Sequence, residues 1–288
     1  MTKWLIENGL FDDDFYKNLF KSLSDRSIEY LSIDNYCDFA SMDKMSKVIE
    51  SNPDTFFVPY GCINFCKNIQ RIFNELKHWN NGLFLRMNNL SFERYSSYWI
   101  DYCLNHDYFI VTYERFCNNY DILFDVFGID NSIFARPISN DKSFTGRLFH
   151  KDSFEHDSLY MGYSCRVDLP NDLLIAVSSP KNVIKEWRFA IYNNLIVSSS
   201  LYNVNGLNEE ECGCHDEDVV NLVKKVLMDS WRPDDVYILD VGKLEDGSCK
   251  VIEIGSLNCA GWYKMDISNI VNMIENFRIN TENKDNYK

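Results

Sequence analysis

Two short apolar segments near the end of the chain, residues 237–241 and 251–258, each carry a carboxylate. Asp240 lies in the first segment, Glu253 lies in the second, and Asn258 follows it. The connection between them is acidic and contains a glycine, which is typical of a hairpin loop. We therefore expect two antiparallel strands that place Asp240, Glu253 and Asn258 side by side. Such oxygen donors suit Mg²⁺, which takes one or two carboxylates together with substrate phosphates, although an acidic hairpin without a metal fits these residues equally well.

A polar turn after a predicted strand is a second candidate for chemistry. The strand, residues 132–137, carries Arg136 near its end, and the turn that follows contains Lys142, Thr145 and Gly146. Cations and the backbone N–H groups of a small-residue turn can bind the anionic oxygens of a triphosphate. The turn is not a Walker A motif, and a plain surface turn is the simpler interpretation of this segment alone.

A third candidate lies in the strand-like segment of residues 184–192. Because side chains alternate along a strand, Glu186 and Arg188 share one face, while Trp187 and Phe189 point to the other. A Glu and Arg pair of this kind is usually a structural ion pair. It becomes a candidate for chemistry only if its face lines a cleft that holds phosphates.

The composition limits the classes of protein to which the chain can belong. The 288 residues are 45% hydrophobic, and the net charge of −14 argues against a nucleic-acid partner, because phosphate contacts demand clustered Lys and Arg. No apolar run approaches the ~20 residues that span a bilayer, and the acidic N-terminal segment does not resemble a signal peptide. The ten cysteines lack framework spacing, so we expect reduced thiols in a cytoplasmic, reducing compartment.

Three units must position these side chains. Residues 1–125 alternate strand-like and helix-like segments, which favours a Rossmann-like α/β domain. Its expected strands are residues 4–6, 28–33 and 55–61, and its expected helices are residues 15–23 and 62–76. Residues 126–205 form the second unit, with strands expected at 132–137, 173–178, 184–192 and 195–202. Residues 206–288 form the third, with helices expected at 217–229 and 267–277 beside the hairpin, and a polar tail from residue 280 that we expect to fray.

The order of these motifs resembles that of ATP-grasp enzymes. More narrowly, residues 55–275 resemble the phage- and bacterium-associated ATP-grasp clade named for one arginine and two lysines. The motifs that carry the resemblance are Val58-Pro59-Tyr60-Gly61, Arg136-Pro137, the turn from Asp141 to Gly146, Glu186-Trp187-Arg188, Asp240, Glu253, and Asn258-Cys259-Ala260-Gly261-Trp262-Tyr263. Each motif is weak alone, whereas their ordered combination is more specific.

The resemblance implies an ATP-grasp fold, in which an N-terminal Rossmann-like domain precedes two α+β lobes around an ATP cleft. It also implies a Mg²⁺-ATP-dependent, ADP-forming ligase. In such enzymes a carboxylate attacks the γ-phosphate, and an amine captures the resulting acylphosphate. Amino acids and peptides are the candidate substrates, and the sequence does not identify them or the oligomeric state.

The resemblance also implies roles for individual residues. Arg136 corresponds to a cation on the ATP phosphates, and Lys142 with Thr145 and Gly146 corresponds to a mobile phosphate loop. Glu186 and Arg188 correspond to a strand that faces the transferred phosphoryl group. There Arg188 would steady the acylphosphate, which makes Arg188 and Lys142 the expected catalytic residues.

The metal site carries the main departure from the family pattern. Asp240 and Glu253 correspond to Mg²⁺ ligands, but the family's Glu-x-Asn is Glu253-Ile254-Gly255 here. Glycine has no side chain with which to bind a metal. Asn258 or a water molecule are the candidates to replace the missing ligand.

Two further assignments follow from the resemblance. Lys181 is the expected second lysine of the clade, with Lys185 and Lys264 as alternatives. The apolar run at residues 174–177 falls where such enzymes bind adenine.

Other classes of function remain possible interpretations of the sequence. The departure at Gly255 favours a nucleotide-binding assembly factor that performs no ligation. Modification of an RNA end or a protein terminus would require a basic groove beside the ATP site, and the acidic charge balance counts against RNA. A structural protein with an acidic hairpin would bind neither nucleotide nor Mg²⁺.

Overall fold

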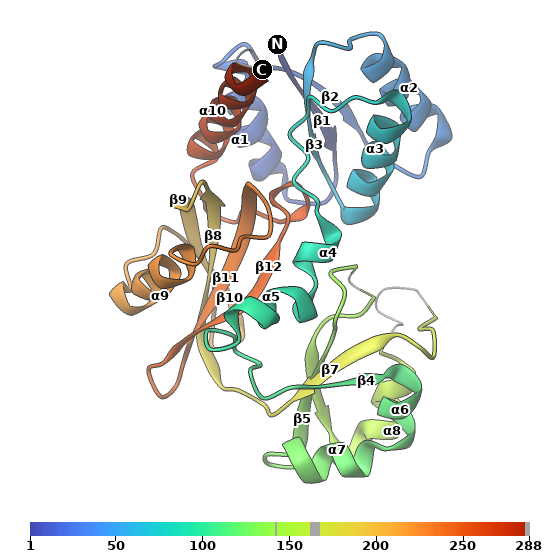
Figure 1. The fold of residues 1–288 in the computed structure, drawn as a ribbon, viewed down its shortest axis with the longest axis vertical. Coiled ribbons are helices and arrows are strands. Elements are labelled where there is room, and N and C mark those ends of the chain that lie inside the picture. The colour runs from blue at the N-terminus through green and yellow to red at the C-terminus, as the bar shows by residue number, and fades with distance from the viewer. Residues whose placement is uncertain (142, 162–167, 286–288) are drawn as a thin grey trace.

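The computed structural model describes residues 1–141, 143–161 and 168–285 and contains three β-sheets that follow one another along its longest axis (Figure 1). The first sheet is parallel, with strand order β2-β1-β3. Its strands are β1 (Thr2–Glu7), β2 (Glu29–Ile33) and β3 (Phe56–Tyr60), which confirms the expected strands of the N-terminal domain.

Helices α1 (Asp13–Ser24), α2 (Phe39–Glu50) and α3 (Ile63–Leu76) accompany this sheet. α1 and α3 were expected from their apolar spacing, whereas α2 was not. α2 buries only Met45 and Ile49, so its sequence carries little helical periodicity.

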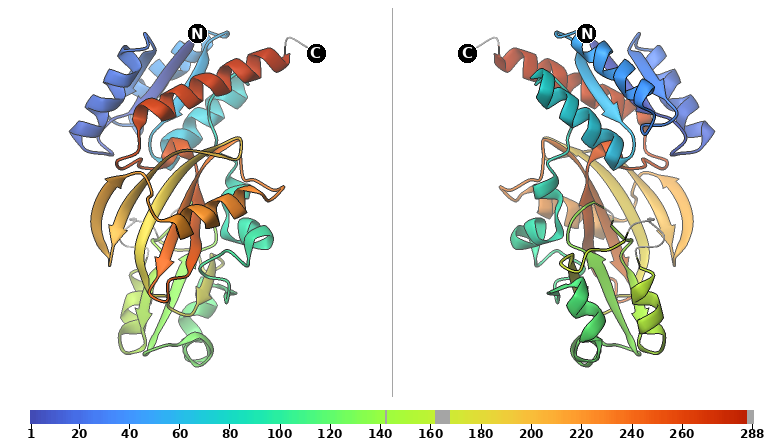
Figure 2. Two further views of the ribbon diagram at one scale, coloured as in Figure 1. Left: turned by 90° about the vertical axis from the view of Figure 1, so that its left-hand side faces the viewer. Right: turned by 90° about the vertical axis from the view of Figure 1, so that its right-hand side faces the viewer.

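The C-terminal helix α10 (Ile267–Asp285) returns to the N-terminal domain and lies beside α1 (Figures 1 and 2). Arg26, which follows α1, donates to the side chains of Ser268 and Asn272 (2.5 and 2.8 Å). The polar tail expected from residue 280 is helical up to Asp285, and residues 286–288 lie outside the described residues. Arg278 stabilises this part through an ion pair with Glu282 at 2.8 Å.

The second sheet is antiparallel, with order β4-β7-β5-β6, and we call this part of the molecule the small lobe. Its strands are β4 (Phe109–Thr112), β5 (Ser132–Pro137), β6 (Arg147–His150) and β7 (Leu174–Ser178). Its helices are α6 (Tyr113–Asn118), α7 (Tyr120–Phe127), η1 (Lys151–Ser153) and α8 (Phe154–Leu159). Helices α4 (Met87–Leu90) and α5 (Phe92–Trp99) connect the N-terminal domain to this lobe.

The third sheet has five antiparallel strands in the order β10-β9-β8-β11-β12. Its strands are β8 (Val183–Tyr192), β9 (Leu195–Val204), β10 (Leu207–Cys212), β11 (Val236–Leu244) and β12 (Cys249–Gly255). α9 (Glu217–Leu227) lies across one face, and η3 (Leu257–Cys259) follows the last strand. The expected hairpin is confirmed as β11 and β12, with Gly247 in the turn at a φ of +83° that favours glycine.

The sheets divide the chain at other points than the expected boundaries at residues 125 and 205. β4 lies before residue 125 but pairs with β7 of the small lobe. β8 and β9 lie before residue 205 but pair with each other, and β8 pairs with β11 in the five-stranded sheet. The physical reason is that long-range strand pairing, which local periodicity does not report, assigns each strand to its sheet.

Three hydrophobic cores of described residues hold these units, one of which packs α1 and α10 against β1 and β3. A second core runs without interruption from the N-terminal domain, through α5, to the five-stranded sheet; it includes Leu5, Phe57, Trp99, Trp187 and Leu239. The small lobe has its own core, which includes Phe116, Ile133, Phe149 and Ile175. Among the described helices, none combines the length and apolarity that would be needed to cross a membrane.

Candidate active site

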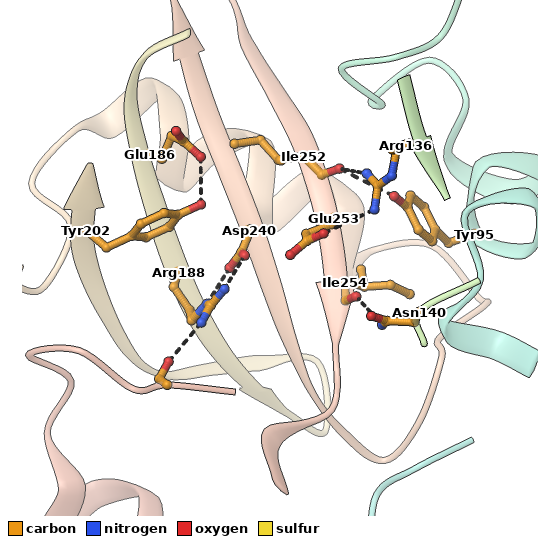
Figure 3. A network of polar contacts seen from close by, with 11 residues as sticks. Tyr95, Arg136, Asn140, Glu186, Arg188, Tyr202, Asp240, Ile252, Glu253 and Ile254 are labelled. Atoms are coloured by element: carbon orange, nitrogen blue, oxygen red, sulfur yellow. Dashed lines mark hydrogen bonds and ion pairs between the residues drawn. The ribbon is translucent and has the colours of Figure 1, made fainter. Parts of the chain in front are cut away.

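Three charged side chains form one row across the five-stranded sheet. Asp240 on β11 is in register with Arg188 on β8 on one side and with Glu253 on β12 on the other. Residues paired across neighbouring strands point to the same face of a sheet, and Figure 3 shows all three together. The predicted proximity of Asp240 and Glu253 is therefore confirmed.

Arg188 is fixed by Asp240 and by two aromatic rings. Its Nε donates to Asp240 Oδ1 (2.8 Å), its Nη2 donates to Asp240 Oδ2 (2.6 Å), and its Nη1 donates to the carbonyl oxygen of Gly261 (2.9 Å). The guanidinium lies 5.4 Å from the ring centre of Tyr202 and 5.0 Å from that of Tyr263. Burial opposes the charge of Arg188, but the carboxylate of Asp240 outweighs burial and raises the pKa of the arginine. The pair is therefore ionised and rigid.

Arg136 connects the small lobe to the hairpin. From the end of β5, its Nη1 donates to the carbonyl oxygen of Ile252 (2.9 Å) and its Nη2 donates to Glu253 Oε2 (3.1 Å) (Figure 3). The Arg136 side chain is 15% exposed, and that of Glu253 is 40% exposed. The cation expected at the phosphates thus contacts the acid expected at the metal, although 117 positions separate them in sequence.

A cavity of about 690 Å³ opens between the small lobe and the five-stranded sheet, within the range of ligand sites in proteins. Charged side chains from both sides line it, namely Arg136, Arg147, Lys181, Glu186 and Glu253. Apolar side chains complete its walls, among them Leu104, Phe134, Phe144, Val183 and Ile252. The lining therefore offers a ligand both charged and apolar contacts.

The predicted phosphate loop is only partly within the described residues. Thr145 and Gly146 line the large cavity, whereas Lys142 lies outside the described residues. Residues 174–177, expected beside adenine, belong to β7, and Ile175 and Val177 are buried in the small-lobe core. Ser179 and Lys181, which follow β7, line the large cavity instead.

The three candidates for the second lysine lie in different places. Lys181 lines the large cavity, and its Nζ lies 2.9 Å from both carboxylate oxygens of Asp107. Lys185 is exposed and precedes Glu186 on β8, so it points to the opposite face of the sheet. Lys264 is 60% exposed, and its nearest described acid is Glu210 at 3.9 Å. Of the three, Lys181 is the one whose position matches the expected role.

Glu186 lines the large cavity near Arg188, Asp240 and Glu253. Burial raises the pKa of Glu186 above its ordinary value, and the charges of Asp240 and Glu253 act in the same direction. The hydroxyl of Tyr202 donates to Glu186 Oε2 (2.7 Å) and opposes the increase. Trp187 on the other face is buried, which confirms the predicted alternation of β8.

Asn258 does not join Asp240 and Glu253; its side chain is turned toward the N-terminal domain. Its Oδ1 accepts from the backbone N–H of Phe84 (2.8 Å), and its Nδ2 donates to the carbonyl oxygens of Pro59 (2.6 Å) and Gly82 (2.9 Å). The residue is 2% exposed. Because the amide is committed to three backbone groups, the metal site proposed below leaves Asn258 out.

Gly255 occupies the position where the family pattern has asparagine. It lies two residues after Glu253 on β12, so a side chain here would point to the same face. A Cβ at this position would meet only the Cβ of Ile238, at 3.9 Å, which is ordinary van der Waals contact. Steric crowding therefore does not explain the glycine.

Three polar side chains at the site carried no recognisable signal in the sequence. Asp107 pairs with Lys181; burial opposes ionisation of Asp107, but the hydrogen bonds and charge of Lys181 outweigh burial and lower its pKa. Asn140 donates to the carbonyl oxygen of Ile254 (3.0 Å), and the Tyr95 hydroxyl donates to the carbonyl oxygen of Ile252 (3.4 Å). Each contact is long-range in sequence, so no local spacing could reveal it.

Asp240 and Glu253 present oxygen donors of the kind that Mg²⁺ prefers. Mg²⁺ keeps several waters and needs only one or two carboxylates when a nucleotide provides phosphate oxygens. Within the part of the chain that the structure describes, no group of three or more His, Cys, Asp or Glu residues is placed to hold a metal ion. The donor set therefore fits a metal that arrives with a phosphate ligand.

Comparison with solved structures shows the same fold in several ligases. The D-alanine–D-alanine ligase from Bacillus anthracis superposes with a TM-score of 0.63 at 12% identity, over 99% of each chain. D-Cycloserine synthetase gives 0.55 at 10% identity, over 96% of this chain and all of that one. An ATP-grasp ligase complexed with a minimal precursor gives 0.56 at 10% identity, over 94% and 96%. These likenesses show the fold, which is the ATP-grasp fold.

The sequence comparison is more specific. No curated protein matches the chain. Residues 120–273, more than half of the chain, match the model of an ATP-grasp domain family, the second family of the clade named for one arginine and two lysines. The matched region contains Arg136, Lys181, Arg188, Asp240 and Glu253. The protein therefore belongs to this clade of the ATP-grasp superfamily, which confirms the resemblance seen in its sequence.

Proposed function

We propose that the protein is a Mg²⁺- and ATP-dependent, ADP-forming ligase that joins a carboxylate to an amine, with amino acids and peptides as candidate substrates. The observation that carries this proposal is the contact of Arg136 with Glu253 at the wall of the large cavity, with Asp240 next to Glu253 on the paired strand. Phosphoryl transfer requires alignment and charge neutralisation more than covalent participation by the protein. The site offers both alignment and charge neutralisation.

Each side of the cavity has a separate task in this proposal. Arg136 and Lys181 bind phosphate oxygens of ATP, and Thr145 and Gly146 close over them. Asp240 and Glu253 would hold Mg²⁺, which would supply positive charge to neutralise the phosphates. Arg188, fixed by Asp240, faces the carboxylate that reacts. These tasks require one metal ion and not two.

The bond changes in the proposed reaction are simple. A carboxylate oxygen of the substrate bonds to the γ-phosphorus, and the bond from that phosphorus to the bridging oxygen breaks, which releases ADP. The amine then attacks the acyl carbon and loses a proton, and phosphate leaves. The residues named above orient the two ends and hold charge.

A second candidate is a nucleotide-binding protein that performs no ligation, and Gly255 favours it. With two acids and no asparagine, the site has fewer metal ligands than the family pattern. Such a protein would bind Mg²⁺-ATP but would release neither ADP nor phosphate with any acceptor. The two candidates therefore differ in turnover and not in binding.

Calorimetry with Mg²⁺-ATP tests the shared part of both candidates. We expect Glu253→Gln and Lys181→Gln to weaken ATP binding by about tenfold or more, because each removes a charge worth about 1.5–3 kcal/mol in a hydrogen bond. Lys185→Gln is the matched control, since Lys185 is exposed on the opposite face of β8. We expect it to bind ATP like the unmodified protein.

Two results would contradict the proposal. If the unmodified protein bound no ATP in the presence of Mg²⁺, both candidates would fail. If Lys185→Gln weakened binding as much as Lys181→Gln, a general charge effect and not the cavity would explain the loss.

A further inference from the structure

A second cavity, of about 280 Å³, lies between the N-terminal domain and the five-stranded sheet. Glu253 and Asn140 line both this cavity and the larger one, so the two spaces meet at these residues. A carboxylate at the junction would lie beside the acid proposed to hold Mg²⁺. We call this second space the side pocket; the inference drawn from it rests on the proposed function.

The N-terminal domain gives the side pocket an apolar wall. Leu10 and Phe11 approach from the connection after β1, Ile63 from the start of α3, and Leu85 and Leu90 from the segment around α4. Apolar walls favour an apolar occupant because each buried Å² of apolar surface contributes about 25 cal/mol. The body of the occupant must therefore be apolar.

The side pocket has no cation to spare for a second anionic group. Arg188 is the one lysine or arginine among the described residues that line it. Three of its five N–H donors bond to Asp240 or to Gly261, and in the proposed function the remaining two face the carboxylate that reacts. The backbone N–H of Cys62, at the start of α3, donates to Glu7 Oε2 (2.8 Å). A second carboxylate or a phosphate here would be desolvated without a partner, which is costly.

The other polar lining groups are neutral or already bonded. Burial raises the pKa of the Cys62 thiol to about 12, so this group carries no charge at neutral pH. The hydroxyl of Ser256 accepts from the backbone N–H of Asn258 (3.1 Å). The charged groups of the pocket are therefore confined to the row of Arg188, Asp240 and Glu253, and the wall from the N-terminal domain is apolar.

The volume limits the size of the occupant. A cavity of about 150 Å³ admits a benzene ring, so about 280 Å³ admits a molecule of roughly a dozen non-hydrogen atoms. We infer that the side pocket binds the acyl substrate, and that this substrate is a monocarboxylate whose remaining body is apolar and of about this size. Its carboxylate lies at the junction with the large cavity, and its body lies against Leu10, Phe11 and Ile63.

Hydroxylamine trapping tests this inference without knowledge of the natural amine. The carboxylate takes the γ-phosphoryl group and releases ADP; hydroxylamine then attacks the acyl carbon, loses a proton and displaces phosphate, which leaves a hydroxamate that gives a coloured complex with added iron. With Mg²⁺-ATP, we expect 3-phenylpropionate to form hydroxamate at least about tenfold faster than glutarate, because the pocket leaves a second charge unpaired.

A charge placed at the pocket wall should change this preference. Leu10 is 41% exposed, and its backbone N–H donates to the Tyr16 hydroxyl (3.1 Å) whatever its side chain, so substitution here spares the fold. We expect Leu10→Lys to lower the ratio of phenylpropionate to glutarate rates by about fivefold or more, through the new cation. Leu10→Met, which stays apolar, is the matched control and should keep the original ratio.

The outcomes separate this inference from the proposed function. ATP binding with glutarate preferred over phenylpropionate would overturn the substrate class and leave the proposed function intact. ATP binding with no hydroxamate from either acid would overturn the inference and support the non-ligating candidate. Absence of ATP binding would overturn the proposed function itself. An unchanged ratio in Leu10→Lys would show that Leu10 does not face the substrate.

Discussion

At the scale of single residues, the site consists of acids that are each held by an arginine. Asp240 is paired with Arg188 and Glu253 with Arg136, and the two acids are neighbours on paired strands. Two carboxylates placed together without cations would repel each other and raise their pKa values. The arginines offset this repulsion and fix the orientation of both acids, which suits the metal site proposed above.

The clearest prediction at this scale concerns Gly255. We expect Gly255→Asn to fold, because a Cβ there would meet only the Cβ of Ile238, at 3.9 Å. We also expect it to lower by about tenfold the Mg²⁺ concentration that half-saturates ATP binding. The asparagine oxygen would lie on the same strand face as Glu253 and could join the metal ligands. A calorimetric ATP titration at several Mg²⁺ concentrations measures the change.

The control for this prediction is Gly255→Ala, which adds a Cβ without a ligand atom. It should leave the Mg²⁺ requirement of ATP binding as it is in the unmodified protein. Equal gains in the alanine and asparagine variants would show that strand rigidity, and not metal ligation, caused the effect.

At the scale of elements, Asn258 joins three parts of the chain below the site. From η3 it bonds to the backbone at Pro59 in β3 and at Gly82 and Phe84, which precede α4. These bonds position the segment that follows the metal hairpin against the N-terminal domain. The sequence made Asn258 a candidate metal ligand, whereas its position in the structure gives it a structural task.

We expect Asn258→Ala to reduce the free energy of unfolding by about 3 kcal/mol. It would leave one buried N–H and two buried carbonyl groups without their partner, and each such group costs about 1–3 kcal/mol. Urea unfolding measures the loss. Asn182→Ala is the matched control, because Asn182 is exposed and its side chain donates to Glu245 at the surface.

The losses of unfolding free energy in Asn258→Ala and Asn182→Ala decide whether this prediction holds. If both asparagine variants unfolded at the same urea concentration as the unmodified protein, the three backbone bonds would not stabilise the fold. If Asn258→Ala kept its stability but bound Mg²⁺-ATP more weakly, a metal role for Asn258 would return.

At the scale of the whole molecule, the ATP-grasp cleft lies between a rigid body and a lobe with its own core. The N-terminal domain and the five-stranded sheet share a continuous hydrophobic core, whereas the small-lobe core contains only residues from 111 to 177 among the described residues. Arg136 and Asn140 reach across the cleft from the small lobe to the hairpin. Apart from these bonds and a few side chains such as Ala176 of β7, which belongs to the shared core, the small lobe packs on its own core, so we expect it to open without the rest of the molecule.

This division predicts how stability is distributed. We expect Phe149→Ala, which opens a cavity in the small-lobe core at a cost of about 3–5 kcal/mol, to speed hydrogen exchange of backbone amides in β5 and β7. Protection of β8 and β11 should be unchanged, because Phe149 does not belong to their core. Hydrogen exchange followed by mass spectrometry measures both regions in one experiment.

Trp99→Ala provides the comparison, since Trp99 is 1% exposed within the shared core. It should speed exchange in the N-terminal domain and the five-stranded sheet together. Uniform loss of protection in Phe149→Ala would show that the molecule unfolds as one unit and that the small lobe has no independence.

The local patterns of the sequence determined most elements and their chemistry. Apolar spacing predicted α1 and α3, a continuous apolar run predicted β3, and the acidic hairpin placed Asp240 beside Glu253, because these features depend on neighbours in the chain. Weakly periodic elements such as α2 and the exposed strand β10 gave no such signal. Their positions follow from packing and pairing partners elsewhere in the chain.

Only the tertiary structure decided which residues share a space. It placed Lys181 at the large cavity, paired with Asp107, and placed Lys185 and Lys264 elsewhere. It also committed the side chain of Asn258 to backbone groups of the N-terminal domain. These outcomes depend on contacts between residues far apart in sequence, and the free energy of such contacts appears only when sheets and lobes pack. The spacing of residues along the chain specifies on which face of a strand or helix a side chain lies. Tertiary packing specifies which other residues that face contacts.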